Sequence, residues 1–179
     1  MELKIDGTWS LFLDRDGVIN RKLENDYVKS WEEFEFIPGA LKSIASFSKI
    51  FGRIIVVTNQ QGIGKGLYTH EELELVHAKM IHEIELTGGR IDKVYYSPNL
   101  NSENSILRKP NIGMGLKAKE DFPEIDFKKS IIIGDSVSDM QFGKNLGMTT
   151  FYITSKDISK YGKNILFDFI ISSLADVRL

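Results

Sequence analysis

The chain has 179 residues, 42% of them hydrophobic, so we expect one compact domain over residues 1–179. Its 23 Lys and Arg against 25 Asp and Glu give a formal net charge of −2, which offers no basic surface for nucleic acid, and the absence of cysteine excludes disulfides and thiolate metal ligands. Because there is no signal-peptide layout, and no apolar run near the roughly 20 residues that cross a bilayer, we expect a cytoplasmic monomer without a membrane partner.

Apolar runs typical of buried strands recur along the chain, and helical patterns fill the gaps between them. In chain order the predicted strands are Ser10–Leu13, Ile54–Val57, Lys93–Tyr96, Ser130–Ile133, Thr149–Ile153 and Phe167–Ile170. The predicted helices are Pro38–Ile50, Thr69–Leu86, Asn111–Asp121 and Ser138–Leu146. This alternation predicts an α/β fold, a Rossmann-like three-layer sandwich with a mainly parallel sheet and no large cap domain.

Two carboxylates two positions apart end the first predicted strand. Asp14 and Asp16 start on one side of it, because residues i and i+2 of a strand point the same way. Gly17 then permits a tight turn. Two close carboxylates repel unless a cation or a shared proton lies nearby. An ordinary Asp-Gly turn gives the same pattern, so the other strand ends must decide.

The remaining strand ends carry polar groups of complementary kinds. In open α/β sheets, ligands bind beyond the carboxyl ends of the strands, so these groups are expected to meet at one edge. They are Thr58 and Asn59 after the second run, Arg108 and Lys109 beyond the third, and Asp135 and Asp139 after the fourth. Acids, a hydroxyl, an amide and two cations together suit a phosphate dianion and a divalent cation.

These residue types support the hydrolysis of a phosphate ester through a covalent intermediate. We expect Asp14 to attack phosphorus and form an acyl phosphate, and Asp16 to protonate the leaving oxygen and later deprotonate the attacking water. The expected Mg²⁺ ligands are Asp14, Asp135 and the backbone carbonyl of Asp16. The groups expected to hold the phosphate oxygens are Thr58, Lys109 and the backbone N–H of Asn59. Asp139 is expected to orient Lys109 or a water of the Mg²⁺ shell.

Four motifs in this order resemble those of the haloacid dehalogenase (HAD) superfamily of phosphohydrolases. They are Phe12-Leu-Asp-Arg-Asp-Gly-Val-Ile-Asn20, Val57-Thr-Asn-Gln60, Arg108-Lys-Pro110 and Gly134-Asp-Ser-Val-Ser-Asp139. Flanking residues, including Phe34-Glu-Phe-Ile-Pro-Gly39 and Gln61-Gly-Ile-Gly-Lys-Gly66, resemble the nearly capless branch of heptose 1,7-bisphosphate and histidinol-phosphate phosphatases. The resemblance covers essentially the whole chain and implies a HAD-like fold and an aspartyl-phosphate mechanism with Mg²⁺.

The resemblance also implies a substrate, a small phosphate ester. We expect removal of the 7-phosphate of D-glycero-D-manno-heptose 1,7-bisphosphate, with histidinol phosphate or another sugar phosphate as the alternative. The candidate substrate-binding residues are Arg108, the loop residues Asn25, Asp26 and Tyr27, and Gln60 and Gln61 after the second strand.

Two departures from the family pattern leave the substrate open. Many members carry a zinc loop with Cys-x-His and Cys-x-Cys, whereas this chain reads Ser97-Pro98-Asn99 and Ser105-Ile106-Leu107, so no structural zinc is expected. Heptose-type members often carry lysine after the metal aspartate, and here the residue is Ser136.

Two other reactions of an aspartyl phosphate remain as alternatives. A receiver-like signalling domain also uses a phosphorylatable aspartate on a parallel sheet, but it has no acid two residues beyond, so Asp16 favours a phosphatase. A mutase must exclude water, and the lack of a large cap argues against it. The three histidines of the predicted helix Thr69–Leu86, His70, His77 and His82, are expected at the surface or in packing roles.

Overall fold

A computed structural model describes residues 4–154 and 167–177 of the chain. Its strands form one sheet in the order β3-β2-β1-β4-β5-β6, and each neighbouring pair is parallel. The strands are β1 (Ser10–Leu13), β2 (Arg53–Asn59), β3 (Lys93–Ser97), β4 (Ser130–Gly134), β5 (Thr149–Ile153) and β6 (Phe169–Ile171). The predicted parallel sheet is confirmed.

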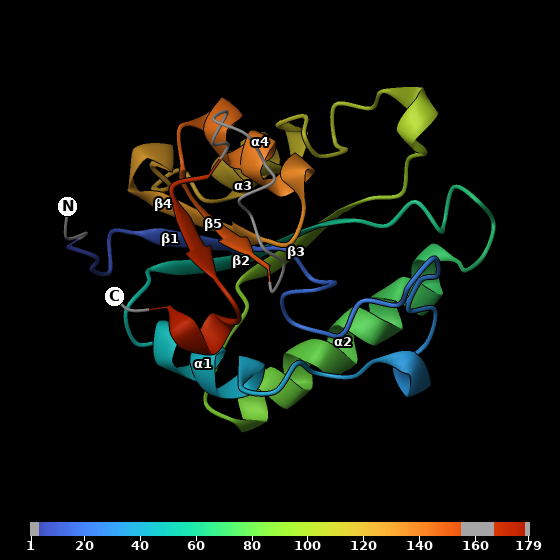
Figure 1. Cartoon of the computed structure of the whole chain (residues 1–179), viewed down its shortest axis with the longest axis horizontal. Coiled ribbons are helices and arrows are strands. Elements are labelled where there is room, and N and C mark those ends of the chain that lie inside the picture. Colours follow the sequence, from blue (N-terminus) through green and yellow to red (C-terminus); the bar gives the residue numbers. More distant parts are fainter. Residues whose placement is uncertain (1–3, 155–166, 178–179) are drawn as a thin grey trace.

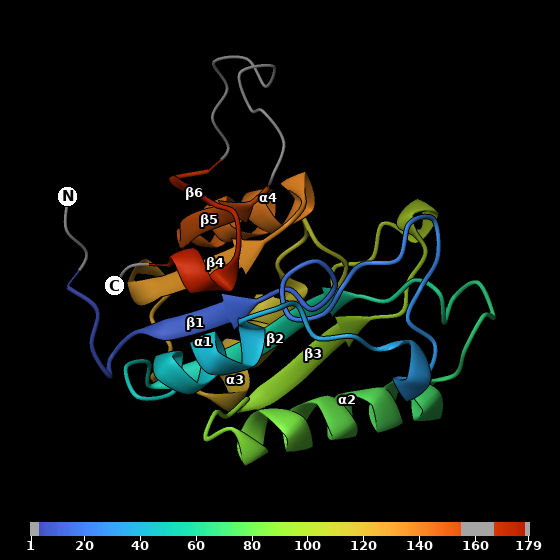
Figure 2. The same ribbon diagram turned by 60° about the horizontal axis from the view of Figure 1, so that its bottom comes forward.

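Helices cover both faces of this sheet, which gives the predicted three layers (Figures 1 and 2). The α-helices are α1 (Ala40–Phe47), α2 (His70–Leu86), α3 (Gly113–Asp121) and α4 (Val137–Leu146). In both views α1 and α2 lie on one face and α3 and α4 on the other. Capping boxes open two helices, Thr69 with Glu72 at α2 and Ser136 with Asp139 at α4. In the part of the chain that is described, no helix has the length and apolar character to span a bilayer.

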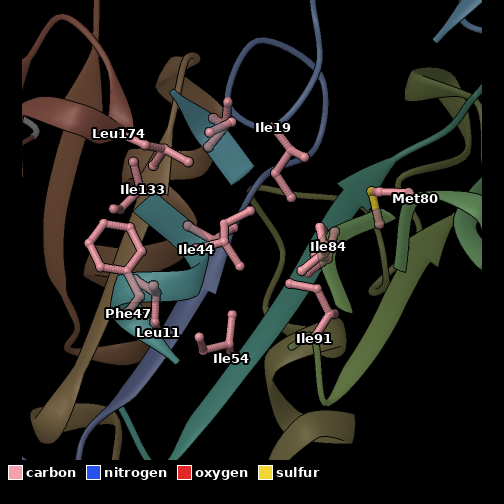
Figure 3. Close-up of a cluster of buried hydrophobic side chains, with 14 of the residues drawn as sticks. Leu11, Ile19, Ile44, Phe47, Ile54, Met80, Ile84, Ile91, Ile133 and Leu174 are labelled. Atoms are coloured by element: carbon pink, nitrogen blue, oxygen red, sulfur yellow. The ribbon is translucent and has the colours of Figure 1, made fainter. Parts of the chain in front are cut away.

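The side chains of the central strands alternate between two apolar clusters. Leu11 and Leu13 of β1 belong to the cluster under α1 and α2, where Ile44 and Met80 also pack (Figure 3). Phe12 belongs to the other cluster, beneath α3 and α4. Burial on both faces explains why these strands are apolar at nearly every position rather than alternating.

Most predicted boundaries differ from the structure by one or more residues, among them those of the first helix, the last strand and the third helix. The first helix is shorter than Pro38–Ile50, because Gly39 adopts a left-handed conformation with φ 86° at its N-cap. The last strand is Phe169–Ile171 rather than Phe167–Ile170, since the backbone N–H of Asp168 instead donates to the carbonyl of Thr150. The third helix begins at Gly113, two residues after the predicted start.

The strand register brings the polar strand ends together. Leu13 of β1 lies opposite Val56 on one side and Ile133 on the other. The next residue, Asp14, donates its backbone N–H to the carbonyl of Ile133 at 3.0 Å. The end of β1 is therefore flanked by the ends of β2 and β4.

Candidate active site

A pocket of about 260 Å³ lies at the carboxyl ends of β1, β2 and β4. The predicted site residues in its wall are Asp14, Asp16, Asp26, Tyr27, Thr58, Asn59, Gln61, Arg108, Lys109, Asp135 and Asp139. Asn25 and Gln60 were also predicted to contact substrate, but they are not among the residues that form this wall. Asn25 lies in an exposed turn with φ 58°.

Three carboxylates converge on the floor of the pocket. Asp14, Asp135 and Asp139 each offer an oxygen, and these atoms lie within 4.8 Å of one another. Lys109 reaches two of them, with Nζ 3.0 Å from Oδ1 of Asp14 and 2.5 Å from Oδ1 of Asp139. The same ammonium donates to the backbone carbonyl of Val57 at 2.7 Å. Lys109 is thus fixed by three oxygens, one of which belongs to Asp139.

The electrostatics of this cluster leave negative charge uncompensated. Burial, together with the neighbouring Asp139, raises the pKa of Asp14 to about 7, although Lys109 opposes the shift. Burial also raises the pKa of Asp135. Burial disfavours the charged form of Lys109, but Asp139 and Asp14 outweigh this and raise its pKa. Two ammoniums, Lys109 beside Asp14 and Asp139 and Lys22 beside Asp135, face three carboxylates, which leaves one negative charge for a further cation.

The residues present fit a hard divalent cation. Oδ1 of Asp135 is buried and has no hydrogen-bond partner among the described residues. Gly17 packs against this carboxylate so closely that a Cβ there would lie 2.3 Å from Oδ2 of Asp135, and its φ of 85° also favours glycine. An unsatisfied buried carboxylate oxygen beside a second carboxylate is the donor chemistry that Mg²⁺ takes.

Asp14 is held in one orientation by its neighbours. Its Oδ1 accepts from the backbone N–H of Arg15 at 2.8 Å and from Lys109. Its Oδ2 accepts no hydrogen bond from any residue that the structure describes. The carboxylate is therefore fixed through one oxygen, and the other is available to a ligand.

Asp16 lies in a cage of hydrogen-bond donors. Arg15 Nη2 donates to both of its carboxylate oxygens, at 2.9 and 3.0 Å. The side-chain amides of Asn20 and Gln60 each donate at 2.9 Å. Burial would raise the pKa of Asp16, but Arg15 and these amides outweigh it and lower the pKa. Asp16 is thus a fixed, ionised carboxylate.

Arg15 is a site residue to which sequence reasoning assigned no role. Its side chain is fully buried, and Nη1 lies 3.2 Å from Nε2 of His77 on α2. Burial and the Arg15 charge lower the pKa of His77 to about 3, so the imidazole is neutral and accepts from the guanidinium. No local pattern in the sequence marks Arg15 for this role, because its partner His77 lies 62 positions away.

Gln60 occupies a different place from the one predicted. Its Nε2 donates to Asp16 and, at 2.9 Å, to Oγ1 of Thr58, while its Oε1 accepts from Tyr68 at 2.6 Å. These partners use the amide and bury it behind the pocket wall. Gln60 therefore orients Asp16 and Thr58 rather than facing a substrate.

Asn59 brackets the main chain of Lys109. Its Nδ2 donates to the carbonyl of Lys109 at 3.1 Å, and its Oδ1 accepts from the Lys109 N–H at 3.0 Å. This pair of bonds joins the end of β2 to the loop that carries Lys109.

The outer wall of the pocket is built from two loops. The hydroxyl of Tyr27 accepts from Gln61 at 2.8 Å and from Lys65 at 3.0 Å. Arg108 is tied to the facing loop, where Nη1 donates to the carbonyl of Asn99 at 3.2 Å. Glu103 in turn accepts from the Leu100 N–H at 2.9 Å. These polar contacts tie the loop after β3 to Arg108.

The chain is similar in sequence to known phosphatases. The profile of the family described as polynucleotide kinase 3 phosphatase matches residues 10–169. The D-glycero-alpha-D-manno-heptose-1,7-bisphosphate 7-phosphatase of Campylobacter jejuni is 39% identical over 150 residues, 84% of this chain and 84% of that one. The D-glycero-beta-D-manno-heptose-1,7-bisphosphate 7-phosphatase of Escherichia coli K12 is 33% identical over 178 residues, 94% of this chain and 91% of that one.

A solved structure of the same kind superimposes on the whole fold. It is the crystal structure of D,D-heptose 1,7-bisphosphate phosphatase from B. bronchiseptica complexed with magnesium and phosphate. The TM-score is 0.84 at 27% identity, and the alignment covers 93% of this chain and 94% of the other.

Proposed function

The chain belongs to the polynucleotide kinase 3 phosphatase family of HAD-like phosphatases, and from that premise we propose that it hydrolyses the 7-phosphate of D-glycero-D-manno-heptose 1,7-bisphosphate. The observation that carries the chemistry is the contact of Lys109 with both Asp14 and Asp139 beside the unpartnered oxygen of Asp135. The substrate rests on the relatives, whose names give both anomers of this sugar.

Asp14 is the proposed nucleophile. Its Oδ2 attacks phosphorus, the bond from phosphorus to the sugar oxygen breaks, and an aspartyl phosphate forms. Lys109 stabilises the negative charge that spreads over the phosphoryl oxygens, and the buried hydroxyl of Thr58 stands at the neighbouring strand end. Because Lys109 is already fixed by three oxygens, it needs no reorganisation when the substrate arrives.

Asp16 is the proposed acid and base. A dianionic phosphate beside it raises its pKa, so the carboxyl gains a proton when the substrate binds and can pass it to the leaving oxygen. The resulting carboxylate then takes a proton from the water that attacks the aspartyl phosphate. The hydrogen bonds from Arg15, Asn20 and Gln60 hold the Asp16 carboxylate in one orientation through both steps.

Mg²⁺ is the proposed metal, and the solved relative with magnesium and phosphate supports it. The residues that would hold it are Asp14, Asp135 and the backbone carbonyl of Asp16. When bound, it supplies charge neutralisation for the meeting of a carboxylate with a phosphate dianion.

The test is a panel of phosphate esters assayed with and without Mg²⁺. Heptose 1,7-bisphosphate should give the highest kcat/KM, above histidinol phosphate, simple sugar monophosphates and an oligonucleotide with a 3′-phosphate. The oligonucleotide tests for the 3′-phosphatase activity that the family's description names. The chain's net charge of −2 disfavours a nucleic-acid substrate. Equal turnover of all four would refute the proposed substrate and leave the phosphatase chemistry intact.

A further inference from the structure

Three cationic side chains line the pocket, and they differ in the partners that their N–H donors already have. Lys109 is buried and donates to three oxygens. Arg108 donates to Asn99 and Asn101 of its facing loop. Lys22, from the loop after β1, makes one ion pair, with Asp135, among the described residues. Lys22 and Arg108 therefore both keep donors without a described partner, and Lys22 is the one that lies beside Asp135.

Lys22 pairs with one carboxylate oxygen of Asp135 and leaves the other oxygen available for a metal. Its Nζ lies 2.7 Å from Oδ2 of Asp135, whereas the buried oxygen of Asp135 without a described partner is Oδ1. An ammonium has three donors, and this contact uses one of them. The side chain lines the pocket and is 54% exposed, so its other donors are accessible to solvent.

A second anionic group on the substrate would meet two acids of the pocket wall. Once the transferred phosphate lies against Lys109, any other phosphate on the substrate meets a wall that includes Asp26 and Asp135. These acids disfavour such a substrate, and the charge of Lys22 beside Asp135 offsets them on that side of the pocket. Residue 136, next to that aspartate, is a serine whose side chain is used to cap α4 by accepting from the N–H of Asp139, so it supplies no charge.

We propose that Lys22 binds the second anionic group of the substrate, anchored by its ion pair with Asp135. This rests on the proposed function, because it requires a substrate with two phosphates. The site therefore favours a sugar with two phosphates, and Lys22, from the loop after β1, binds the phosphate that is not transferred. Lys22 determines specificity and takes no part in bond breaking.

The experiment compares kcat/KM for heptose 1,7-bisphosphate and for the same heptose carrying only the 7-phosphate, at saturating Mg²⁺. In Lys22→Ala, kcat/KM for the bisphosphate should fall roughly tenfold to a hundredfold, while kcat/KM for the monophosphate changes less than about twofold. Lys22→Arg should retain most of the preference, because it keeps the charge. Arg21→Ala is the matched control, since this neighbouring cation pairs with Glu35 outside the pocket wall and should change neither value.

The alternatives give different results. An equal fall in kcat/KM for both substrates, with a shifted Mg²⁺ requirement, would mean that Lys22 acts only through Asp135. That result would overturn the inference. Retention of the full preference by Lys22→Ala would also overturn it while leaving the proposed substrate in place. A wild-type enzyme with no preference for the bisphosphate would overturn both proposals.

Discussion

The Nζ atom of Lys109 lies 3.0 Å from Oδ1 of Asp14, and both side chains are almost entirely buried. This contact joins the proposed nucleophile to the cation that would hold the phosphate. It also explains how an acid can be retained in a buried cluster of three carboxylates, because an uncompensated buried charge is costly.

Removal of the Lys109 charge should destabilise the fold. Lys109→Met leaves Asp14 and Asp139 without their shared partner, so the free energy of unfolding at pH 8 should fall by about 3 kcal/mol. The loss should shrink at pH 5, since the carboxyls can then take up protons. Urea unfolding at the two pH values measures it.

The matched control for Lys109→Met is Lys93→Met. Lys93 pairs with Asp121 at the surface, where both side chains are more than one third exposed, so its removal should cost less than about 1 kcal/mol. Equal losses in the two variants would contradict the assignment of Lys109 as the partner of the buried acids.

Mg²⁺ binding should depend on pH near neutrality. Because the pKa of Asp14 is raised to about 7, its carboxyl is mostly protonated below that pH, and a bound cation must displace the proton. The apparent affinity for Mg²⁺ should therefore fall as the pH is lowered from 8 to 6, with protons released on binding. Isothermal titration in buffers of different ionisation enthalpy measures both. Binding without proton release at pH 7 would contradict the raised pKa.

His77 should make stability more sensitive to acid. Its pKa is lowered to about 3 in the folded chain by burial and by Arg15, whereas an unfolded histidine titrates near 6.5. Its contribution is fully present above about 6.5 and is lost as the pH falls toward 3, because only the unfolded chain takes up the proton.

The comparison of wild type with His77→Gln isolates this effect, since glutamine keeps an acceptor for Arg15. Between pH 7 and pH 5 the wild type should lose roughly 2 kcal/mol more unfolding free energy than the variant. Parallel losses in the two proteins would show that His77 does not stay neutral in the fold.

The ends of the central strands could be predicted from this sequence. The Ile and Val runs of β2 and β4 predict buried parallel strands, and the topology of such a sheet then brings Asp14, Thr58 and Asp135 to one edge. The start of helix α2 could also be predicted, because Thr69 and Glu72 have the spacing of a capping box.

Other features depend on tertiary contacts that leave no local pattern. Arg15 is buried because His77, 62 positions away in the sequence, accepts from it. Gln60 faces away from the pocket because Asp16, Thr58 and Tyr68 together use its amide. Lys22 reaches Asp135 across 113 positions, from a loop whose path has no periodic signal.

The central claim is that Asp14 carries the phosphoryl group during turnover. Acid quenching of the enzyme during turnover of a substrate labelled in its 7-phosphate, with Mg²⁺ present, should trap label on the protein as a hydroxylamine-sensitive acyl phosphate. Asp14→Asn should trap none and release no phosphate above background. Asp16→Asn retains the nucleophile and slows the hydrolysis of the intermediate, so any label that it forms should persist longer. Phosphate release by Asp14→Asn at a rate near that of the wild type would contradict the account.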